Sequence, residues 1–150
     1  MSTLAFSLIA SLLACGEKSG STSAPAAAAA TKFTMDLPDD ATSRSFAETL
    51  VGGVTTKFTP TDADGAAFEY TKLLFRPDGS WNAEGYVEAM DERMECAESG
   101  TWSVEDVSSK TVATIAWTVS DTSCVGRDKG ASTRAQVTAG ANGISSALFR

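Results

Sequence analysis

Apolar and polar side chains alternate with a period of two residues through much of the second half of the chain. Residues 81–88 alternate a small or apolar side chain with a polar one, and the pattern returns around Trp102, Ile115 and Val137. A strand with one face against a core produces this alternation, whereas a helix does not. The sequence therefore predicts strands near residues 53–59, 67–76, 80–88, 96–105, 111–120, 133–139 and 144–149.

Turn residues separate these predicted strands. Pro77-Asp78-Gly79 lies between the second and third strands, and Asn142-Gly143 lies between the last two; both are typical of hairpins. No helical crossover segment interrupts the series. The predicted fold class is therefore all-β, an antiparallel meander of about seven strands that forms a small closed or nearly closed barrel. A β-sandwich is the alternative.

One short helix is predicted before the barrel. Ser45 and Glu48 have the spacing of a capping box, in which each side chain bonds to the backbone N–H of the other residue. Phe46 and Leu50 share one helical face, and residues 52–53 are both glycine, which is a stop signal. We therefore expect the helix to begin at Ser45 and to end at the two glycines.

The N-terminus has the pattern of an export signal. Residues 4–14 form an uncharged, largely apolar run, which is too short to cross a bilayer and fits the apolar core of a secretion signal. The run ends in Leu-Leu-Ala-Cys15, which resembles the lipobox of bacterial lipoproteins. No basic residue precedes the run, so either the true start lies upstream of Met1 or the signal is atypical. A buried N-terminal helix with an incidental cysteine is the alternative.

The lipobox resemblance implies cleavage before Cys15, a diacylglycerol on its sulfur and usually an acyl chain on its amine. Two or more such chains hold a protein stably at a membrane. In these lipoproteins an Asp after the cysteine commonly retains the protein at the inner membrane. Gly16 stands there, so the resemblance implies the outer membrane, facing the periplasm or the cell surface.

The predicted organisation has three parts. Residues 1–14 are a signal peptide, and residues 15–31 are a lipid anchor with a flexible Ala/Ser linker. Residues 16–30 contain no large apolar side chain, so they have nothing to bury and are expected to be flexible. Residues 32–150 form a single β-rich domain.

Two cysteines remain if Cys15 carries lipid. Cys96 and Cys124 are 28 positions apart, and an exported protein lies where disulfides form. We expect a Cys96–Cys124 disulfide, which in the loop-entropy model stabilises a domain by ~3.5 kcal/mol. Two buried free thiols and a metal-binding pair are the alternatives.

Two short phrases resemble elements of lipocalin-like small barrels in bacterial lipoproteins. Residues 75–81 match F-x-x-D-G-x-W, and residues 100–104 contain G-x-W. The resemblance implies a small β-barrel, and barrels of about eight strands sometimes hold one small ligand. Trp81, Trp102 and Trp117 either line such an apolar cavity or fill the core.

The excess negative charge lies in one segment. The chain has a net charge of −7, and residues 84–106 contain eight acidic side chains and one basic one. This balance repels phosphate backbones, so nucleic acid is not an expected partner. The acidic patch either attracts a cation or a basic protein surface, or is simply a solvated face. Glu98 shares the inward phase of its strand and is awkwardly placed for a charge. The members of the acidic patch are Glu88, Asp91, Glu92 and Glu95.

The sequence offers few groups for catalysis. It contains no histidine, which is the usual general base and the commonest metal ligand. Residues 62–65 (Asp-Ala-Asp-Gly) fail as an EF-hand loop, because Pro60 and Thr71 stand where carboxylates are required. No metal or cofactor is expected.

These features predict a non-enzymatic binding or interaction module with a monomeric domain, attached to a membrane through lipid on Cys15. The alternative is a lipocalin-like carrier of a small apolar ligand. The two interpretations differ in whether the barrel interior is filled or hollow.

Changing Cys15→Ser tests the lipoprotein prediction. Serine has no thiol to accept the diacylglycerol, so the variant should incorporate no labelled fatty acid and should keep its signal peptide. Ser7→Ala, in the same apolar run, should be acylated and cut like the wild type. Fatty acid found by mass spectrometry on the Cys15→Ser chain would contradict the prediction.

Overall fold

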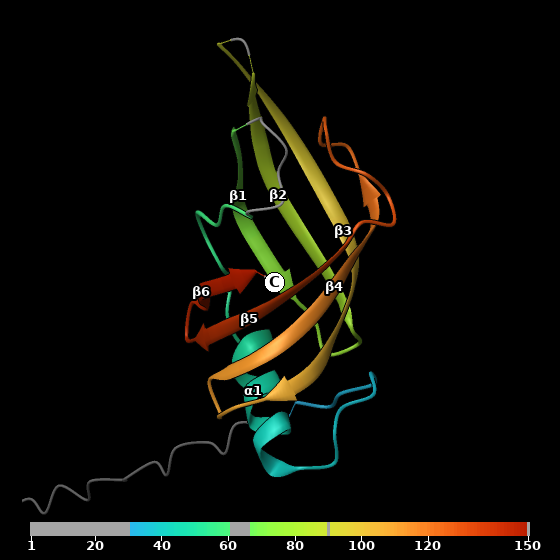
Figure 1. Ribbon diagram of the computed structural model, residues 1–150, viewed down its shortest axis with the longest axis vertical. Helices are drawn as coiled ribbons and strands as arrows, with labels where there is room; N and C mark the ends of the chain where they lie inside the picture. The colour runs from blue at the N-terminus through green and yellow to red at the C-terminus, as the bar shows by residue number, and fades with distance from the viewer. Residues whose placement is uncertain (1–30, 61–66, 90, 150) are drawn as a thin grey trace, which may run out of the picture.

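A single curled β-sheet makes up most of the domain. The computed structural model describes residues 31–60, 67–89 and 91–149. Six antiparallel strands pair in sequence order and curl into a half-barrel, with one helix at its end (Figure 1). The predicted all-β meander is confirmed, with six strands in place of about seven. The elements are α1 (Ala41–Val51), β1 (Ala67–Phe75), β2 (Ser80–Ala89), β3 (Glu92–Val107), β4 (Val112–Thr122), β5 (Ser132–Gly140) and β6 (Gly143–Phe149).

The β2–β3 hairpin is longer than its sequence indicates. β3 begins at Glu92, where the sequence predicts a loop until residue 96. Ala89 pairs with Glu92, and Asp91 in the turn has a positive φ of 66°. Glu92 and Glu95 therefore belong to a strand rather than to the connection. The backbones of β2 and β3 stay paired up to Ala89 and Glu92. The side chains of Glu92 and Glu95 face water there, so the pairing buries no charge.

The predicted strand at residues 53–59 is wrong as a continuous strand. This segment makes only two isolated bridges to β1, from Thr55 to Leu73 and from Phe58 to Tyr70. Between them Lys57 has a positive φ of 56°, and β1 shifts register between Tyr70 and Lys72. A left-handed residue facing a bulge interrupts the ladder.

The same segment fills the open side of the half-barrel. The Thr55 hydroxyl accepts a hydrogen bond of 2.6 Å from the backbone N–H of Ile144, at the start of β6. The backbones approach so closely that a Cβ on Gly53 would lie 2.1 Å from the Gly143 nitrogen. Residues 53–58 therefore lie between β1 and β6 and nearly close the barrel, through two bridges and a side chain in place of a seventh strand.

Aromatic rings fill much of the interior. The Trp117 ring lies within 6.4 Å, centroid to centroid, of rings from residues 53–58, β1 and β6. Two of these contacts are edge-on and one is tilted, and such ring pairs add to the free energy of burial. The barrel therefore closes around one connected core. The rings joined by such contacts are those of Phe58, Phe68, Tyr70, Phe75, Trp81, Trp102, Trp117 and Phe149.

Helix α1 covers one end of this core. Phe46, Ala47 and Leu50 are fully buried against strands of the sheet. The helix starts one turn earlier than predicted, because Asp40 caps it by accepting hydrogen bonds from the backbone N–H groups of Thr42 and Ser43. Aspartate caps a helix as well as serine does, so the capping box at Ser45 is wrong. In the described ranges, no helix is long and apolar enough to cross a membrane.

Changing Thr55→Val tests how the barrel closes. Valine keeps the shape but removes the acceptor, which leaves the buried Ile144 N–H without its partner. We expect the free energy of unfolding to fall by about 1–3 kcal/mol. The exposed neighbour Thr56 gives the control Thr56→Val, which should change it by less than about 0.5 kcal/mol. Equal losses in urea unfolding followed by tryptophan fluorescence would contradict this closure.

Candidate functional site

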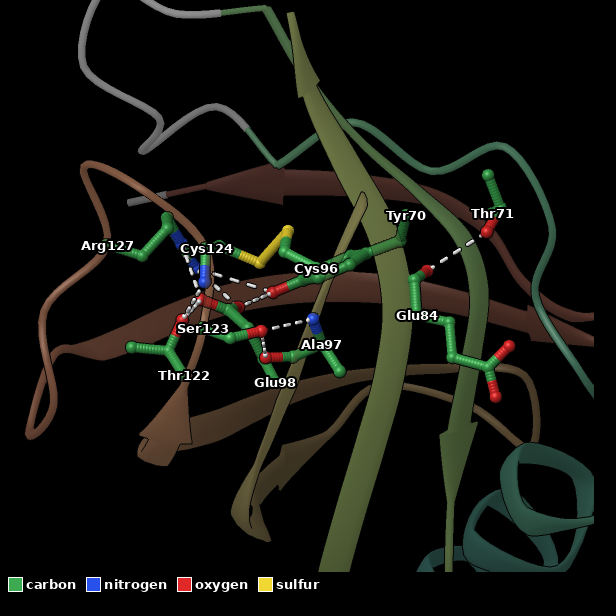
Figure 2. Close-up of a disulfide and its surroundings, with 10 residues drawn as sticks. All are labelled: Tyr70, Thr71, Glu84, Cys96, Ala97, Glu98, Thr122, Ser123, Cys124 and Arg127. Carbon is green, nitrogen blue, oxygen red and sulfur yellow. Dashed lines mark hydrogen bonds and ion pairs between the residues drawn. A yellow bond between two sulfur atoms is a disulfide. The ribbon is translucent and has the colours of Figure 1, made fainter. Parts of the chain in front are cut away.

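A buried charge cluster lies at the end of the core opposite α1. Glu98 points inward from β3, and its side chain is fully buried, while the Arg127 side chain is 5% exposed. Arg127 comes from the loop between β4 and β5. Tyr70 reaches the same point from β1, and Thr122 from the end of β4 (Figure 2). The four side chains form one hydrogen-bonded cluster.

Both oxygens of the Glu98 carboxylate are fully used. Oε1 accepts from the Thr122 hydroxyl at 2.8 Å and from Arg127 Nε at 3.1 Å. Oε2 accepts from the Tyr70 hydroxyl and from Arg127 Nη2, the latter at 3.3 Å. A carboxylate has about four acceptor positions, and protein donors occupy all of them.

The Tyr70 hydroxyl is held as a donor in this cluster. Burial, together with the negative charge of Glu98, raises the pKa of Tyr70 above its usual range. The phenol therefore donates its proton to the Glu98 carboxylate. Arg127 also lies 5.2 Å from the centroid of the Phe68 ring, which adds a cation–π contact.

The disulfide lies directly beside the cluster. Cys96 and Cys124 are joined, with their Cα atoms 4.9 Å apart, which is the pairing that the sequence predicts. The Cys124 N–H donates to the Thr122 hydroxyl at 3.0 Å, and that hydroxyl donates to Glu98. Figure 2 shows the sulfur bridge next to these groups. The bond and the ion pair therefore hold the same loop against β3.

This cluster is built for structure rather than for proton transfer. A general base needs a free acceptor position within reach of a substrate. Glu98 has its acceptor positions filled by Tyr70, Thr122 and Arg127 and is closed off from solvent. By binding Arg127, Glu98 holds the β4–β5 loop in place.

The sequence points to Glu98 but not to its partners. The inward phase of Glu98 marks it as a buried acid. Arg127 follows Cys124 by three positions, and Glu98 follows Cys96 by two. A disulfide between these cysteines brings the two charges together, and this spacing is the signal that could have identified Arg127. Tyr70 and Thr122 carry no comparable signal, because their contacts depend on how the sheet curls.

The three tryptophans are brought together as core residues. Trp81, Trp102 and Trp117 are 2%, 4% and 3% exposed. The indole N–H groups of Trp81 and Trp102 donate to backbone carbonyls at 3.3 and 3.0 Å. Buried indoles with satisfied donors are typical of a packed core. A ligand-binding role for them stays a prediction.

The acidic patch lies on the projecting β2–β3 hairpin. Glu88, Asp91, Glu92 and Glu95 are all exposed, and Glu95 pairs with Arg93 at 2.8 Å. In the described part of the chain, no group of three or more acidic, cysteine or histidine side chains is placed to hold a metal. The predicted signal peptide, Cys15, linker residues 16–30 and residues 62–65 lie outside the described residues.

An open, polar groove crosses the outer face of the sheet beside this hairpin. Its volume is about 510 Å³. It forms where Lys57, with its positive φ, faces the bulge in β1. At its other end the Arg93 guanidinium lies 3.7 Å from the centroid of the Tyr86 ring. Sequence reasoning missed this groove, because it arises from an interrupted ladder. Its lining is Thr56, Lys57, Glu69, Thr71, Tyr86 and Arg93.

Changing Glu98→Gln tests the buried pair. Glutamine keeps the shape but leaves the Arg127 charge uncompensated, so the free energy of unfolding should fall by about 3 kcal/mol. The matched control is Glu95→Gln, which removes an exposed ion pair on the same strand. It should cost less than about 1 kcal/mol.

A double change gives a second check on the pair. Replacing both charges, Glu98→Met with Arg127→Met, should recover much of the lost stability, because no unpaired charge remains buried. If Glu98→Gln behaves like Glu95→Gln in urea unfolding, the pair has no structural role.

Comparison with known proteins finds no match. No protein family, no curated protein and no solved structure matches the chain. The resemblances to lipoproteins and to lipocalin-like barrels therefore stay predictions. Because one fold serves many functions, the groove and the Glu98 cluster indicate more about function than the barrel does.

Proposed function

We propose that this protein is a lipid-anchored, exported binding module that engages its partner without catalysis, through the groove on the outer face of its barrel. The observation that carries the proposal is the position of the groove. The groove lies beside the β2–β3 hairpin, since Tyr86 and Arg93 line it. This hairpin projects from the end of the domain away from the point where the described N-terminal residues reach the barrel (Figure 1). The lipobox-like Cys15 and the Cys96–Cys124 disulfide support export.

The described chain begins at the α1 end of the barrel. The backbone N–H of Thr34 donates to the carbonyl of Pro77, in the turn between β1 and β2, at 3.0 Å. That turn and α1 lie at the same end of the domain (Figure 1). A lipid on Cys15 would therefore hold this end toward the membrane. The β2–β3 hairpin would point away from it.

The groove offers a polar, mixed set of groups to a partner. Lys57 and Arg93 supply cationic donors, Glu69 supplies an acceptor, and Tyr86 supplies a partly buried ring. Apolar small-molecule sites are usually enclosed and lined by hydrophobic side chains, and this groove is neither. Its lining suits a hydrophilic partner surface or a hydrophilic chain.

The alternative, a carrier of an apolar ligand inside the barrel, is less well supported. The tryptophans that would line its cavity are in contact with other rings of the core. The Glu98 cluster covers the end of the core opposite α1. An apolar ligand would have to displace both packed rings and bonded charges.

Site-specific photo-crosslinking in the native cell tests the proposal. A photoreactive residue replaces Thr56, which lines the groove, or Thr111, an exposed threonine before β4 at the other end of the barrel. We expect a discrete crosslinked product from position 56 and none from position 111. Adding Arg93→Ala should weaken the product at position 56 severalfold.

Two results would contradict the proposal. Products of equal yield from both positions would mean that the domain contacts its surroundings without a defined site. A product from position 111 alone would place the partner at the α1 end. Membrane fractionation of the same cells reports separately on the lipid anchor.

A further inference from the structure

We infer that Cys96–Cys124 is a thiol–disulfide exchange site that locks the loop between β4 and β5 over the end of the barrel, and that its reduction releases this loop. The inference follows from one arrangement. A short loop brings Cys124 to Cys96 and Arg127 to Glu98, and both of these partners are in β3. The inference rests on the proposed function in one respect: export places the protein in an oxidising compartment, where the disulfide forms.

One side chain at the tip of the loop is buried. In residues 125–130, all of which the structure describes, every side chain or glycine is exposed except Arg127. Gly126 and Gly130 flank it with positive φ values of 78° and 86°, and no atom lies within 4 Å of a Cβ placed on either. A glycine in open space leaves its backbone free to change conformation, and Gly126 is such a position. Gly130 is held to β4, because its N–H donates to the Val119 carbonyl at 2.7 Å. Arg127 therefore holds the tip between the hinge at Gly126 and the anchored Gly130.

The ion pair by itself is a weak lock. Burying Arg127 and Glu98 removes both charges from water, which offsets most of their attraction. An opening of the loop restores their hydration. The disulfide prevents that opening, because it fixes the base of the loop three residues from Arg127. Ser123 helps to hold the same base, because its N–H donates to the Ala97 carbonyl and its hydroxyl accepts from the Ala97 N–H. An exposed ion pair between Lys129 and Asp121 joins the other side of the loop to β4, but it is non-covalent and in water, where such pairs contribute little.

Opening would uncover a defined surface. The Phe68 and Tyr70 rings lie next to Arg127, with their own centroids 4.7 Å apart. Both are almost fully buried in the closed structure. Release of Arg127 would expose these rings together with the Glu98 carboxylate, at the end of the barrel opposite α1.

The exchange step requires a dithiol reductant. Its thiolate attacks the Cys96 sulfur, because Cys96 is half-buried and Cys124 is buried. The S–S bond breaks, and Cys124 leaves as a thiolate and takes a proton. The second thiol of the reductant then closes on the mixed disulfide and releases Cys96 as a thiolate. Two electrons pass to the protein, and the reductant leaves as a disulfide.

Limited trypsin cleavage of the full chain carrying Cys15→Ser tests the lock, since this variant has no third thiol. Cleavage after Arg127 requires the loop to open, whereas cleavage after the exposed Lys110, in the turn between β3 and β4, does not. With dithiothreitol, we expect cleavage after Arg127 to accelerate at least tenfold and cleavage after Lys110 to change less than twofold. The double variant Cys96→Ser with Cys124→Ser should behave like the reduced protein.

Two outcomes would overturn the inference. An unchanged rate at Arg127 would mean that the disulfide does not restrain the loop. Acceleration at Arg127 and Lys110 together would mean that reduction unfolds the whole domain. Neither outcome depends on export or on the groove, so a failure here differs from a failure of the proposed function.

Reciprocal coupling gives a second measurement. If the disulfide stabilises the Arg127–Glu98 pair, the pair stabilises the disulfide by the same factor. Glu98→Gln should therefore make the bond severalfold easier to reduce in a dithiothreitol titration. Thr122→Val, which removes one donor to Glu98, is the milder variant if Glu98→Gln fails to fold. The control Glu95→Gln, one residue before Cys96, should reduce like the wild type, and identical titrations for all variants would contradict the coupling.

Discussion

The carboxylate of Glu98 has to be compensated inside the barrel, and much of the architecture at that end follows from it. A charge with no exposure to water needs an opposite charge and hydrogen bonds to its remaining lone pairs. Arg127, Tyr70 and Thr122 meet this need from three separate parts of the chain. The β4–β5 loop has to fold back over the core so that Arg127 reaches β3. The two ends of the barrel are thus closed by different physical means, an apolar helix at one and a polar cluster at the other.

The side of the barrel is closed by a third means. A continuous seventh strand would have paired every backbone group between β1 and β6. Residues 53–58 instead use two bridges and the hydroxyl of Thr55. Because Lys57 leaves the extended conformation opposite the bulge in β1, the edge of the barrel opens into the groove. The same irregularity that interrupts the ladder creates the surface to which we assign binding.

These features together describe a domain with two distinct ends. The described N-terminal segment reaches the barrel beside α1, and the β2–β3 hairpin projects toward the opposite end (Figure 1). The groove lies beside that hairpin, since Tyr86 and Arg93 line it. The β4–β5 loop is held by a covalent bond and by an ion pair. Rigid scaffolds of this kind commonly carry their function on loops and on irregular edges. A binding module attached by its α1 end would present those features to a partner.

Patterns in the sequence are enough to predict the all-β meander, the hairpin turns, the cysteine pair and the inward position of Glu98. Each of these depends on local periodicity, on turn chemistry or on the count of one residue type. Three other features become visible only in the folded domain: the helix cap at Asp40, the extension of β3 to Glu92 and the broken pairing of residues 53–58. Only the folded domain also shows that Arg127 and Tyr70 meet Glu98 and that Lys57 faces a bulge. These contacts join residues far apart in the chain, and they form only when the sheet curls. A local sequence pattern indicates which face of a strand a residue occupies, but not which distant residue it meets.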